Sequence, residues 1–303
     1  MNNFTLFGED YSYLVPLLLS NNENGHVHSR FSNGFNIKMG DSLVFIGNNK
    51  NGSLPFGVHL QEIDTSRAVS YVNNGDTVIW NKRTNSIELP GVTISMEKGK
   101  SFKNELTSMK NTTIFHTSLE HFCFQLIKIE EQTGLDVSFR EFLDKFHADG
   151  KQKWLGAEPY LIMLIEAAMS NDEHLIEKVL RYFLGRGQGL TPSGDDMIVG
   201  LLAFDAVSPS LSTAFYDKVS ELIEGESITT DVAREYLRYA LKKEYSSTVS
   251  NMVNALAVDD VSNFEKVLHD LLGVGHSSGL DTVLGILIGM LAFRTKNKYR
   301  NKI

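Results

Sequence analysis

The sequence predicts an α+β protein whose first part is an antiparallel β-rich sheet or barrel and whose second part is mainly α-helical. Two observations predict this. Up to about residue 94, short runs of β-forming residues alternate with turn pairs, whereas after residue 114 apolar residues recur every three to four positions. We therefore expect a β-rich domain at residues 1–110 and a helical domain at residues 111–303.

Four turn pairs that end in glycine mark the β-rich part. They are Asn33-Gly34, Asn51-Gly52, Asn74-Gly75 and Pro90-Gly91. Runs of β-branched and aromatic residues lie between them, at residues 42–46, 77–80 and 92–94. Residues 97–111, which are rich in Lys, Ser and Asn, are expected to lead out of this part.

Amphipathic patterns mark the helical part. Leu119, Phe122, Leu126 and Ile129 fall on one helical face. Similar patterns follow at residues 161–168, 175–183, 216–222, 232–240, 249–256 and 264–271. The last two-thirds of the chain is therefore expected to be mostly helical.

Composition excludes several classes of protein. The hydrophobic fraction of 42% is typical of a folded chain, and the net charge of -8 argues against the basic surface that nucleic acid requires. The single cysteine, Cys123, excludes an internal disulfide and a thiolate metal cluster. It is interpreted as a small buried residue, with a nucleophile as the alternative.

No membrane association is expected. The first twenty residues lack the basic start of a signal peptide. The most apolar segment, Val283 to Phe293, is shorter than the roughly 20 residues that span a bilayer. We therefore interpret it as a buried helix and expect a cytoplasmic protein.

Two glycine-rich loops, Gly185–Asp196 and Gly273–Asp281, carry the most information. Each runs from a Gly-x-Gly sequence to a Ser-Gly-x-Asp sequence, and each opens an apolar helix that contains a further glycine, Gly200 or Gly285. Glycine is costly to order, so a globular protein keeps it where the backbone turns tightly or approaches a ligand. The Ser-Gly-x-Asp sequence of the second loop lies 85 residues after that of the first.

The loops have a structural and a functional interpretation, and both remain open. In the structural one, Ser193 and Ser278 are N-caps and Asp196 and Asp281 are capping-box partners. In the functional one, free N–H groups at the two helix starts hold a small anion. The residues expected to contact it are Gly187, Gly189, Thr191, Ser193, Gly194, Asp195, Gly275, Ser277, Ser278 and Gly279.

Four side chains are expected to act in the chemistry. Arg186 would hold an anionic group, and His276 is the candidate for proton transfer, with a purely loop-bonding histidine as the alternative. Asp196 and Asp281 would position the loops. Thr229 and Thr230 are expected to cap the next helix, with a lesser chance of lining the site.

Common cofactors do not fit the loops. Neither has the lysine of a Walker loop, and the first lacks the spacing of a dinucleotide fold. Adjacent carboxylates at Asp195 and Asp196 usually diverge on a helix, and no histidine stands at ligand spacing. We therefore expect no metal and no cofactor.

The two motifs resemble those of a known family. Gly-Gln-Gly-Leu-Thr-Pro-Ser-Gly-Asp-Asp at 187–196 and Gly-His-Ser-Ser-Gly-Leu-Asp at 275–281 are similar to the signature motifs of the AllH family, which includes a subunit of oxamate carbamoyltransferase. Gln188 stands where many members are expected to have proline, which affects loop stiffness more than chemistry.

The resemblance implies a role in anaerobic allantoin and purine breakdown. There, oxalurate and phosphate give oxamate and carbamoyl phosphate, and the AllH-type protein acts with two partner proteins. Phosphate, a carboxylate and an oxyanion intermediate all call for N–H donors. The competing interpretation is a non-catalytic subunit that binds a small anion or scaffolds its partners.

Overall fold

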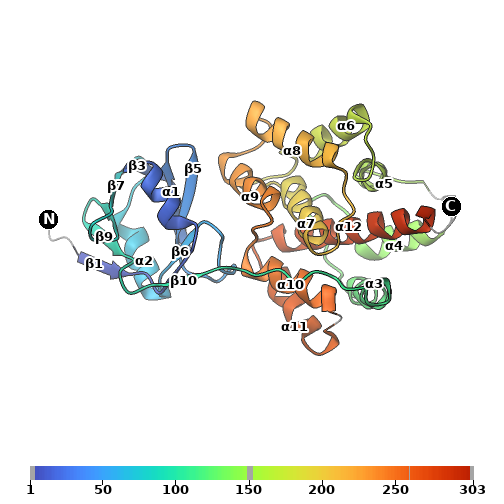
Figure 1. Cartoon of the computed structure of the whole chain (residues 1–303), viewed down its shortest axis with the longest axis horizontal. Helices are drawn as coiled ribbons and strands as arrows, with labels where there is room; N and C mark the ends of the chain where they lie inside the picture. Colours follow the sequence, from blue (N-terminus) through green and yellow to red (C-terminus); the bar gives the residue numbers. More distant parts are fainter. Residues whose placement is uncertain (1–3, 149–152, 259, 301–303) are drawn as a thin grey trace. The chain divides into compact units, whose positions relative to one another are not determined.

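The structure, a computed structural model, describes residues 4–148, 153–258 and 260–300. The chain divides into two compact units, Met1–Glu105 and Leu106–Ile303. The first unit contains β1 (Phe4–Phe7), β2 (Asp10–Ser12), α1 (Val15–Asn21), β3 (Asn24–Phe31), β4 (Gly34–Met39), β5 (Ser42–Gly47), β6 (Gly57–His59), α2 (Glu62–Tyr71), β7 (Thr77–Asn81), β8 (Ser86–Leu89), β9 (Val92–Ser95) and β10 (Lys100–Phe102) (Figure 1).

The strands form one sheet in the order β1-β9-β8-β7-β3-β4-β5-β6-β2-β10. Neighbours in the chain from β3 to β5 and from β7 to β9 pair antiparallel. Two of the predicted turn pairs make such connections, Asn33-Gly34 between β3 and β4 and Pro90-Gly91 between β8 and β9. The β1–β9, β2–β10 and β5–β6 pairs are parallel, so the sheet is mixed. Parallel pairs join segments that no tight turn connects, and local turn signals therefore do not reveal them.

The sheet curls until its two sides meet. β1 and β2 lie near opposite ends of the strand order, yet only Gly8 and Glu9 separate them in the chain, a span of about 10 Å. The Gly8 N–H donates to the Ser95 carbonyl of β9 at 2.9 Å, and the Glu9 N–H donates to the His59 carbonyl of β6 at 2.8 Å. This linker closes the sheet in the manner of a barrel around an apolar core.

Two predicted turns show why glycine is needed there. Gly75 precedes β7 and Gly91 joins β8 to β9, and their φ angles are 87° and 81°. Side chains disfavour this left-handed region, whereas glycine enters it freely. The predicted runs at residues 42–46, 77–80 and 92–94 fall on β5, β7 and β9, whereas α1, α2 and the other strands were not named among the predicted elements.

The second unit is helical, so the predicted α+β class is confirmed. It contains α3 (Thr112–Leu126), α4 (Phe139–His147), α5 (Glu158–Ala167), α6 (Glu173–Phe183), α7 (Ser193–Val207), α8 (Thr213–Gly225), α9 (Asp231–Leu241), α10 (Ser247–Val258), α11 (Val261–Leu272) and α12 (Ser278–Arg300). The predicted amphipathic patterns fall on these helices, although Ile129 lies beyond the end of α3 and Ala168 is the residue after the end of α5.

α7 and α12 form the centre of the helical unit and pack along one another (Figure 1). A Cβ atom on Gly200 of α7 would lie 2.0 Å from the Thr282 carbonyl oxygen of α12. Conversely, a Cβ on Gly285 of α12 would lie 1.9 Å from the Met197 carbonyl oxygen of α7. These two glycines therefore allow the two backbones to touch.

α12 is longer than the apolar segment from which it was predicted. Ser278–Asn297 is long and apolar enough to cross a membrane, but 78% of the most apolar window is buried inside the protein. Every residue of α7 except Ala206 is also buried. A central core helix therefore explains the apolar composition of α12.

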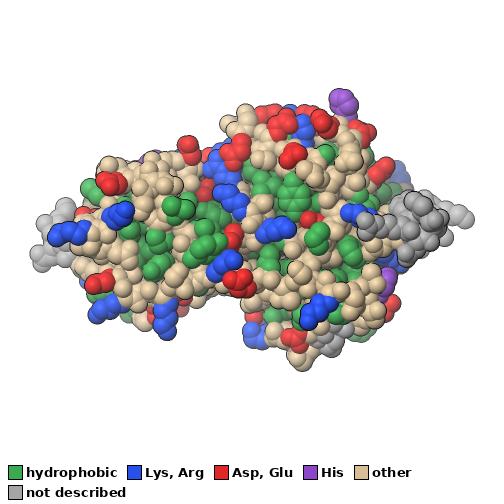
Figure 2. Space-filling model, viewed as in Figure 1, with side chains coloured by type: hydrophobic (Ala, Val, Ile, Leu, Met, Phe, Trp, Pro, Cys, Tyr) green, Lys and Arg blue, Asp and Glu red, His purple; other side chains and the backbone are tan. Residues whose placement is uncertain are grey.

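Charged side chains of both signs are mixed on the face of the protein that Figure 2 shows. In the face shown in Figure 2, acidic and basic side chains are interspersed on both units. This pattern agrees with the modest excess of acidic over basic residues, 37 against 29. The described residues on this face form no extended basic area of the kind that binds a phosphate backbone.

Candidate functional site at the starts of α7 and α12

The loop before α7 turns tightly between the end of α6 at Phe183 and the helix start at Ser193. Gly185 and Gly187 have φ angles of 73° and 122°. A Cβ on Gly185 would lie 2.2 Å from the Ile228 carbonyl oxygen, and one on Gly187 would lie 2.5 Å from the Ser193 nitrogen. The upstream glycines are therefore required by backbone geometry before any ligand is considered.

The prediction that Ser193 caps α7 is wrong. Pro192 is the N-cap residue and makes no side-chain cap, and Ser193 is the first helical residue. Ser278 is likewise the first residue of α12, since the Asp281 N–H donates to the Ser277 carbonyl at 2.9 Å. The serine side chains are thus free to contact the other helix rather than their own first turn.

Serine and aspartate pair across the two helices. The Ser278 hydroxyl of α12 lowers the pKa of Asp196 of α7, and the Ser193 hydroxyl of α7 lowers the pKa of Asp281 of α12, so each serine lies beside the carboxylate of the other helix. The Thr191 and Ser278 hydroxyl oxygens are 3.2 Å apart. The two helix starts therefore lie together, and the capping-box prediction is replaced by reciprocal contacts between equivalent positions of the two motifs.

Asp281 is completely buried. Its Oδ1 accepts a 2.8 Å hydrogen bond from the Gly134 N–H, in the segment between α3 and α4. Burial raises the pKa of Asp281, and the hydroxyls of Ser193 and Ser277 and the Gly134 N–H act in the opposite direction. A Cβ on Gly134 would lie 2.0 Å from the Ser193 Oγ, so a larger residue there would have to displace the serine hydroxyl beside this carboxylate.

Asp195 has a different set of partners. Both of its carboxylate oxygens lie 3.1 Å from the Gly185 nitrogen, and Oδ2 accepts a 2.7 Å bond from the Thr229 hydroxyl. Burial raises the pKa of Asp195 to about 6, while the Thr229 and Gly185 bonds act to lower it. Asp195 therefore ties the start of the first loop to the segment before α9.

Asp196 lies among the other carboxylates of the site. Burial raises its pKa well above the usual value, the Ser278 and Thr191 hydroxyls oppose this, and the charges of Asp281 and Asp195 raise it further. Burial, together with the charge of Asp196, also raises the pKa of Tyr236 on α9. The centre of the site is thus acidic and protonates more readily than exposed carboxylates do.

Several first-turn amides are already bonded within the loops. The Gly194 N–H donates to the Arg186 carbonyl at 2.8 Å, and the Asp195 and Asp196 N–H groups both donate to the Pro192 carbonyl. The Gly279 N–H donates to the Val274 carbonyl at 3.0 Å. A ligand would therefore be held by the outer parts of the loops, not by these four groups.

The outer parts carry the predicted side chains Arg186 and His276, and both are exposed. The Arg186 guanidinium lies 3.8 Å over the Tyr182 ring, and its Nε donates to the Tyr182 carbonyl at 2.8 Å. His276 lies in the loop before α12. Gly187, Gly189 and Gly275, also predicted to contact substrate, are exposed beside them.

Gly134 was not among the predicted site residues, and Thr229 was predicted mainly as a helix cap. A signal for Gly134 was present, because Thr133-Gly134-Leu135-Asp136 repeats the Ser/Thr-Gly-x-Asp pattern of the two loops. Thr230 caps α9 as predicted, since its hydroxyl accepts from the Ala233 N–H at 3.0 Å. Thr229 joins the site through Asp195.

Despite the three aspartates, the described part of the chain contains no group of three or more His, Cys, Asp or Glu side chains arranged to hold a metal ion. Asp196 and Asp281 each keep one buried oxygen, Oδ2, with no hydrogen bond of good geometry. The arrangement is suited to tying two loops together, with the exposed loop residues free to meet a ligand.

Comparison with known families agrees with this division of the chain. Residues 183–290 match the family described as oxamate carbamoyltransferase subunit AllH, and residues 9–101 match the AllH family N-terminal domain. The first match contains both glycine-rich loops. No solved structure matches the chain. On these two matches, the chain belongs to the AllH family.

Proposed function

We propose that this chain is the AllH-type subunit of a cytoplasmic carbamoyltransferase that converts oxalurate and phosphate to oxamate and carbamoyl phosphate in allantoin and purine breakdown. The observation that carries the proposal is the family match at residues 183–290, which contains the paired helix starts. The family description names a subunit, so activity is expected to require partner proteins.

The reaction places clear demands on a site. A phosphate oxygen attacks the carbamoyl carbon, the bond from that carbon to the oxamate nitrogen breaks, and the nitrogen takes a proton. Phosphate and oxalurate are both anions, and negative charge develops on the carbamoyl oxygen. Cationic and N–H donors are the groups that stabilise these charges.

Arg186 and His276 are the side chains assigned to these tasks. Both are exposed on the outer parts of the loops, where a ligand has access. Arg186 is held in place by Tyr182, which itself stacks on Tyr160 at 3.5 Å between ring centres. In the proposal Arg186 holds one anionic group, and His276 orients the carbamoyl group or phosphate and transfers the proton.

The buried aspartates support these side chains and do not attack the substrate. Asp196 and Asp281 contact the serine at the start of the other helix, and Asp195 holds the Gly185 N–H. Displacement of one loop would therefore move the other. This coupling supports a site in which both loops contact one substrate pair.

The test is phosphorolysis of oxalurate by the chain reconstituted with its two partner proteins. Arg186→Ala and His276→Ala are each expected to lower kcat/KM about 100-fold or more. Lys178→Ala on α6 and His269→Ala on α11 are matched controls, because both residues are exposed and lie outside the loops. Full activity of both loop variants would remove these residues from the proposal.

One observation favours a second function. Because acidic side chains and internally bonded amides occupy the helix starts, the loops could instead form a rigid anion-binding or scaffolding module. A binding module would be stabilised thermally by oxalurate, oxamate or phosphate without turnover by the reconstituted complex. A scaffold would show neither stabilisation nor turnover.

A further inference from the structure

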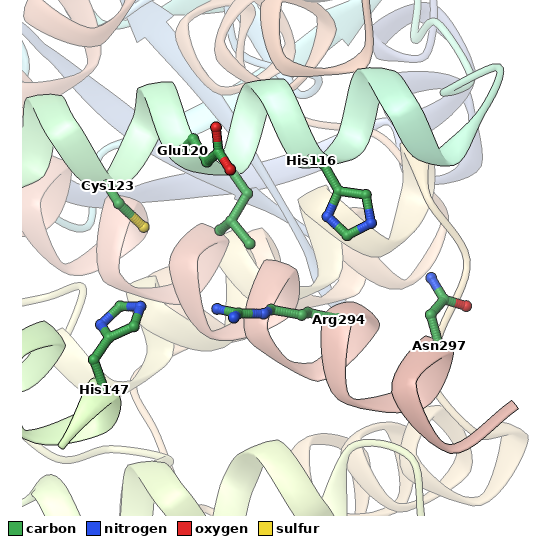
Figure 3. Close-up of a pocket in the computed structure, with 7 residues that line it drawn as sticks. His116, Glu120, Cys123, His147, Arg294 and Asn297 are labelled. Atoms are coloured by element: carbon green, nitrogen blue, oxygen red, sulfur yellow. The ribbon is translucent and has the colours of Figure 1, made fainter. Parts of the chain in front are cut away.

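A pocket of about 470 Å³ lies between α3, α4 and α12. Its lining is His116, Leu119, Glu120, Cys123, His147, Arg294 and Asn297 (Figure 3). Arg294 is 16 residues beyond Ser278 on α12, which corresponds to about 24 Å along a helix. The pocket is therefore separate from the paired helix starts.

Arg294 is the central feature of this pocket. It extends from α12 into the space between α3 and His147 (Figure 3). Among the residues that the structure describes, it forms no ion pair and no hydrogen bond with another side chain, although it is only partly exposed. A guanidinium carries five N–H donors in a planar fork that matches a carboxylate or a phosphate.

The other lining residues narrow the class of ligand. Glu120 contributes one negative charge to the wall, so a doubly charged phosphate would be poorly neutralised by Arg294 alone. Leu119 and Cys123 add an apolar surface, and Asn297 adds an amide. These features favour a singly charged, planar anion with a small apolar body.

His147 provides a hydrogen-bond acceptor for a ligand in this pocket. Its Nδ1 lies 2.7 Å from the Leu143 carbonyl oxygen. Since a carbonyl oxygen only accepts hydrogen bonds, Nδ1 carries a proton and donates it to this bond. In the neutral ring this leaves Nε2 as an acceptor. A ligand that carries an N–H or O–H beside its carboxylate would satisfy both His147 and Arg294.

We propose that this pocket is a second ligand site that binds a small monocarboxylate through Arg294. The proposal does not depend on the carbamoyltransferase function, because it uses none of the loop residues. Cys123 offers a direct probe, since it lines the same pocket and is the only cysteine in the chain. Burial raises the pKa of its thiol to about 11, so alkylation is slow and can be followed by mass spectrometry.

The experiment compares alkylation of Cys123 in the full chain by iodoacetate and by iodoacetamide, which differ mainly in the carboxylate. In both reactions the thiolate sulfur forms a bond to the CH₂ carbon and iodide leaves. Iodoacetate is expected to react with saturation kinetics, and iodoacetamide at a rate linear in its concentration. The ratio of the two rates is independent of the thiolate fraction, so the thiol pKa cancels.

Arg294→Gln is expected to lower the ratio of iodoacetate to iodoacetamide rates about tenfold, and Lys178→Gln is expected to leave it unchanged. Glu120→Gln is expected to raise it, because a like charge is removed. A linear rate with iodoacetate, or an unchanged ratio in Arg294→Gln, would overturn the proposal.

Protection of the unmodified chain gives a second measurement that needs no variant. Propionate is expected to slow alkylation of Cys123 by iodoacetamide in a saturable way, and inorganic phosphate to have little effect. Protection by phosphate but not by propionate would show a phosphate site and contradict the monocarboxylate assignment.

Discussion

The starts of α7 and α12 have the same residues where they pack against neighbouring helices. They differ in the loops that precede them. Gly194 and Gly279 each lie against a carbonyl near the end of the preceding helix. A Cβ atom on Gly194 would lie 1.9 Å from the Phe183 oxygen, and one on Gly279 would lie 2.1 Å from the Leu271 oxygen. Serine, aspartate and the later helix glycine also correspond. The repeat therefore preserves one way of packing two helix starts together.

The differences lie in the loops and at one helical position. The first loop is longer than the second, and Asp195 in α7 corresponds to Leu280 in α12. Asp195 holds Gly185 and Thr229, whereas no carboxylate stands at the equivalent position of the second motif. The positions that the two motifs share thus pack the helix starts together. The positions that differ, such as Arg186, Asp195 and His276, allow the two loops to differ in chemistry.

The largest expected effect tests the shared packing. Gly285→Ala and Gly200→Ala each place a Cβ about 2 Å from a backbone oxygen of the partner helix, so the helices must separate. We expect each to lower the free energy of unfolding by about 3 kcal/mol or more, despite the higher helix propensity of alanine. Urea denaturation followed by circular dichroism measures this.

Two other glycines provide a graded control for that comparison. Gly289→Ala meets only side chains, Phe204 at 3.1 Å and Leu201 at 3.4 Å, and is expected to lower the free energy of unfolding by less. Gly225→Ala at the end of α8 meets no heavy atom within 4 Å and is expected to change stability by less than about 1 kcal/mol. Equal effects at Gly225 and Gly285 would contradict the close approach of α7 and α12.

A smaller effect is expected from Asp195, which distinguishes the first motif from the second. Its folded pKa of about 6 is above the ordinary value of 3.8, so the folded state binds the proton more tightly. Protonation of Asp195 therefore stabilises the folded state. This contribution to the free energy of unfolding is complete below pH 3.8 and is lost as the pH rises through 6, which lowers the free energy of unfolding by about 3 kcal/mol. Between pH 4 and pH 7, Asp195→Asn is therefore expected to gain stability relative to the unmodified chain.

The measurement is urea denaturation of both proteins at several pH values, so that other titrating groups cancel in the difference. Thr229→Val provides a second check, because it removes a bond that favours the charged carboxylate. It is expected to move the pH transition of Asp195 upward. The difference in free energy of unfolding between Asp195→Asn and the unmodified chain should therefore change between pH 4 and pH 7. If it stays constant, Asp195 has an ordinary pKa in the folded state.

The sequence predicted the fold class and the positions of most helices because these depend on local periodicity and turn residues. It also identified the two loops, since the first has four glycines and the second three, and each ends in a Ser-Gly-x-Asp pattern. The parallel β1–β9 and β2–β10 pairs depend on contacts between distant segments, and no local pattern indicates them.

The partners of the site aspartates were harder to predict. A serine three residues before an aspartate indicates a capping box when the helix is considered alone. In the structure the neighbouring helix is close enough to replace the local partner, so Ser193 pairs with Asp281 and Ser278 with Asp196. The repeat itself was the available signal, because two copies of one motif can satisfy each other.

The smallest expected effect on stability belongs to the exposed residues assigned to chemistry. Arg186→Ala loses an exposed cation–π contact and one hydrogen bond to the Tyr182 carbonyl, and is expected to cost less than about 1 kcal/mol. His276→Ala, in the second loop, is expected to cost less than about 0.5 kcal/mol. Thermal unfolding of the isolated chain measures both. If either variant proves strongly destabilised, that residue belongs to the packed part of the repeat, and a loss of carbamoyltransferase activity in that variant would reflect unfolding instead of lost chemistry.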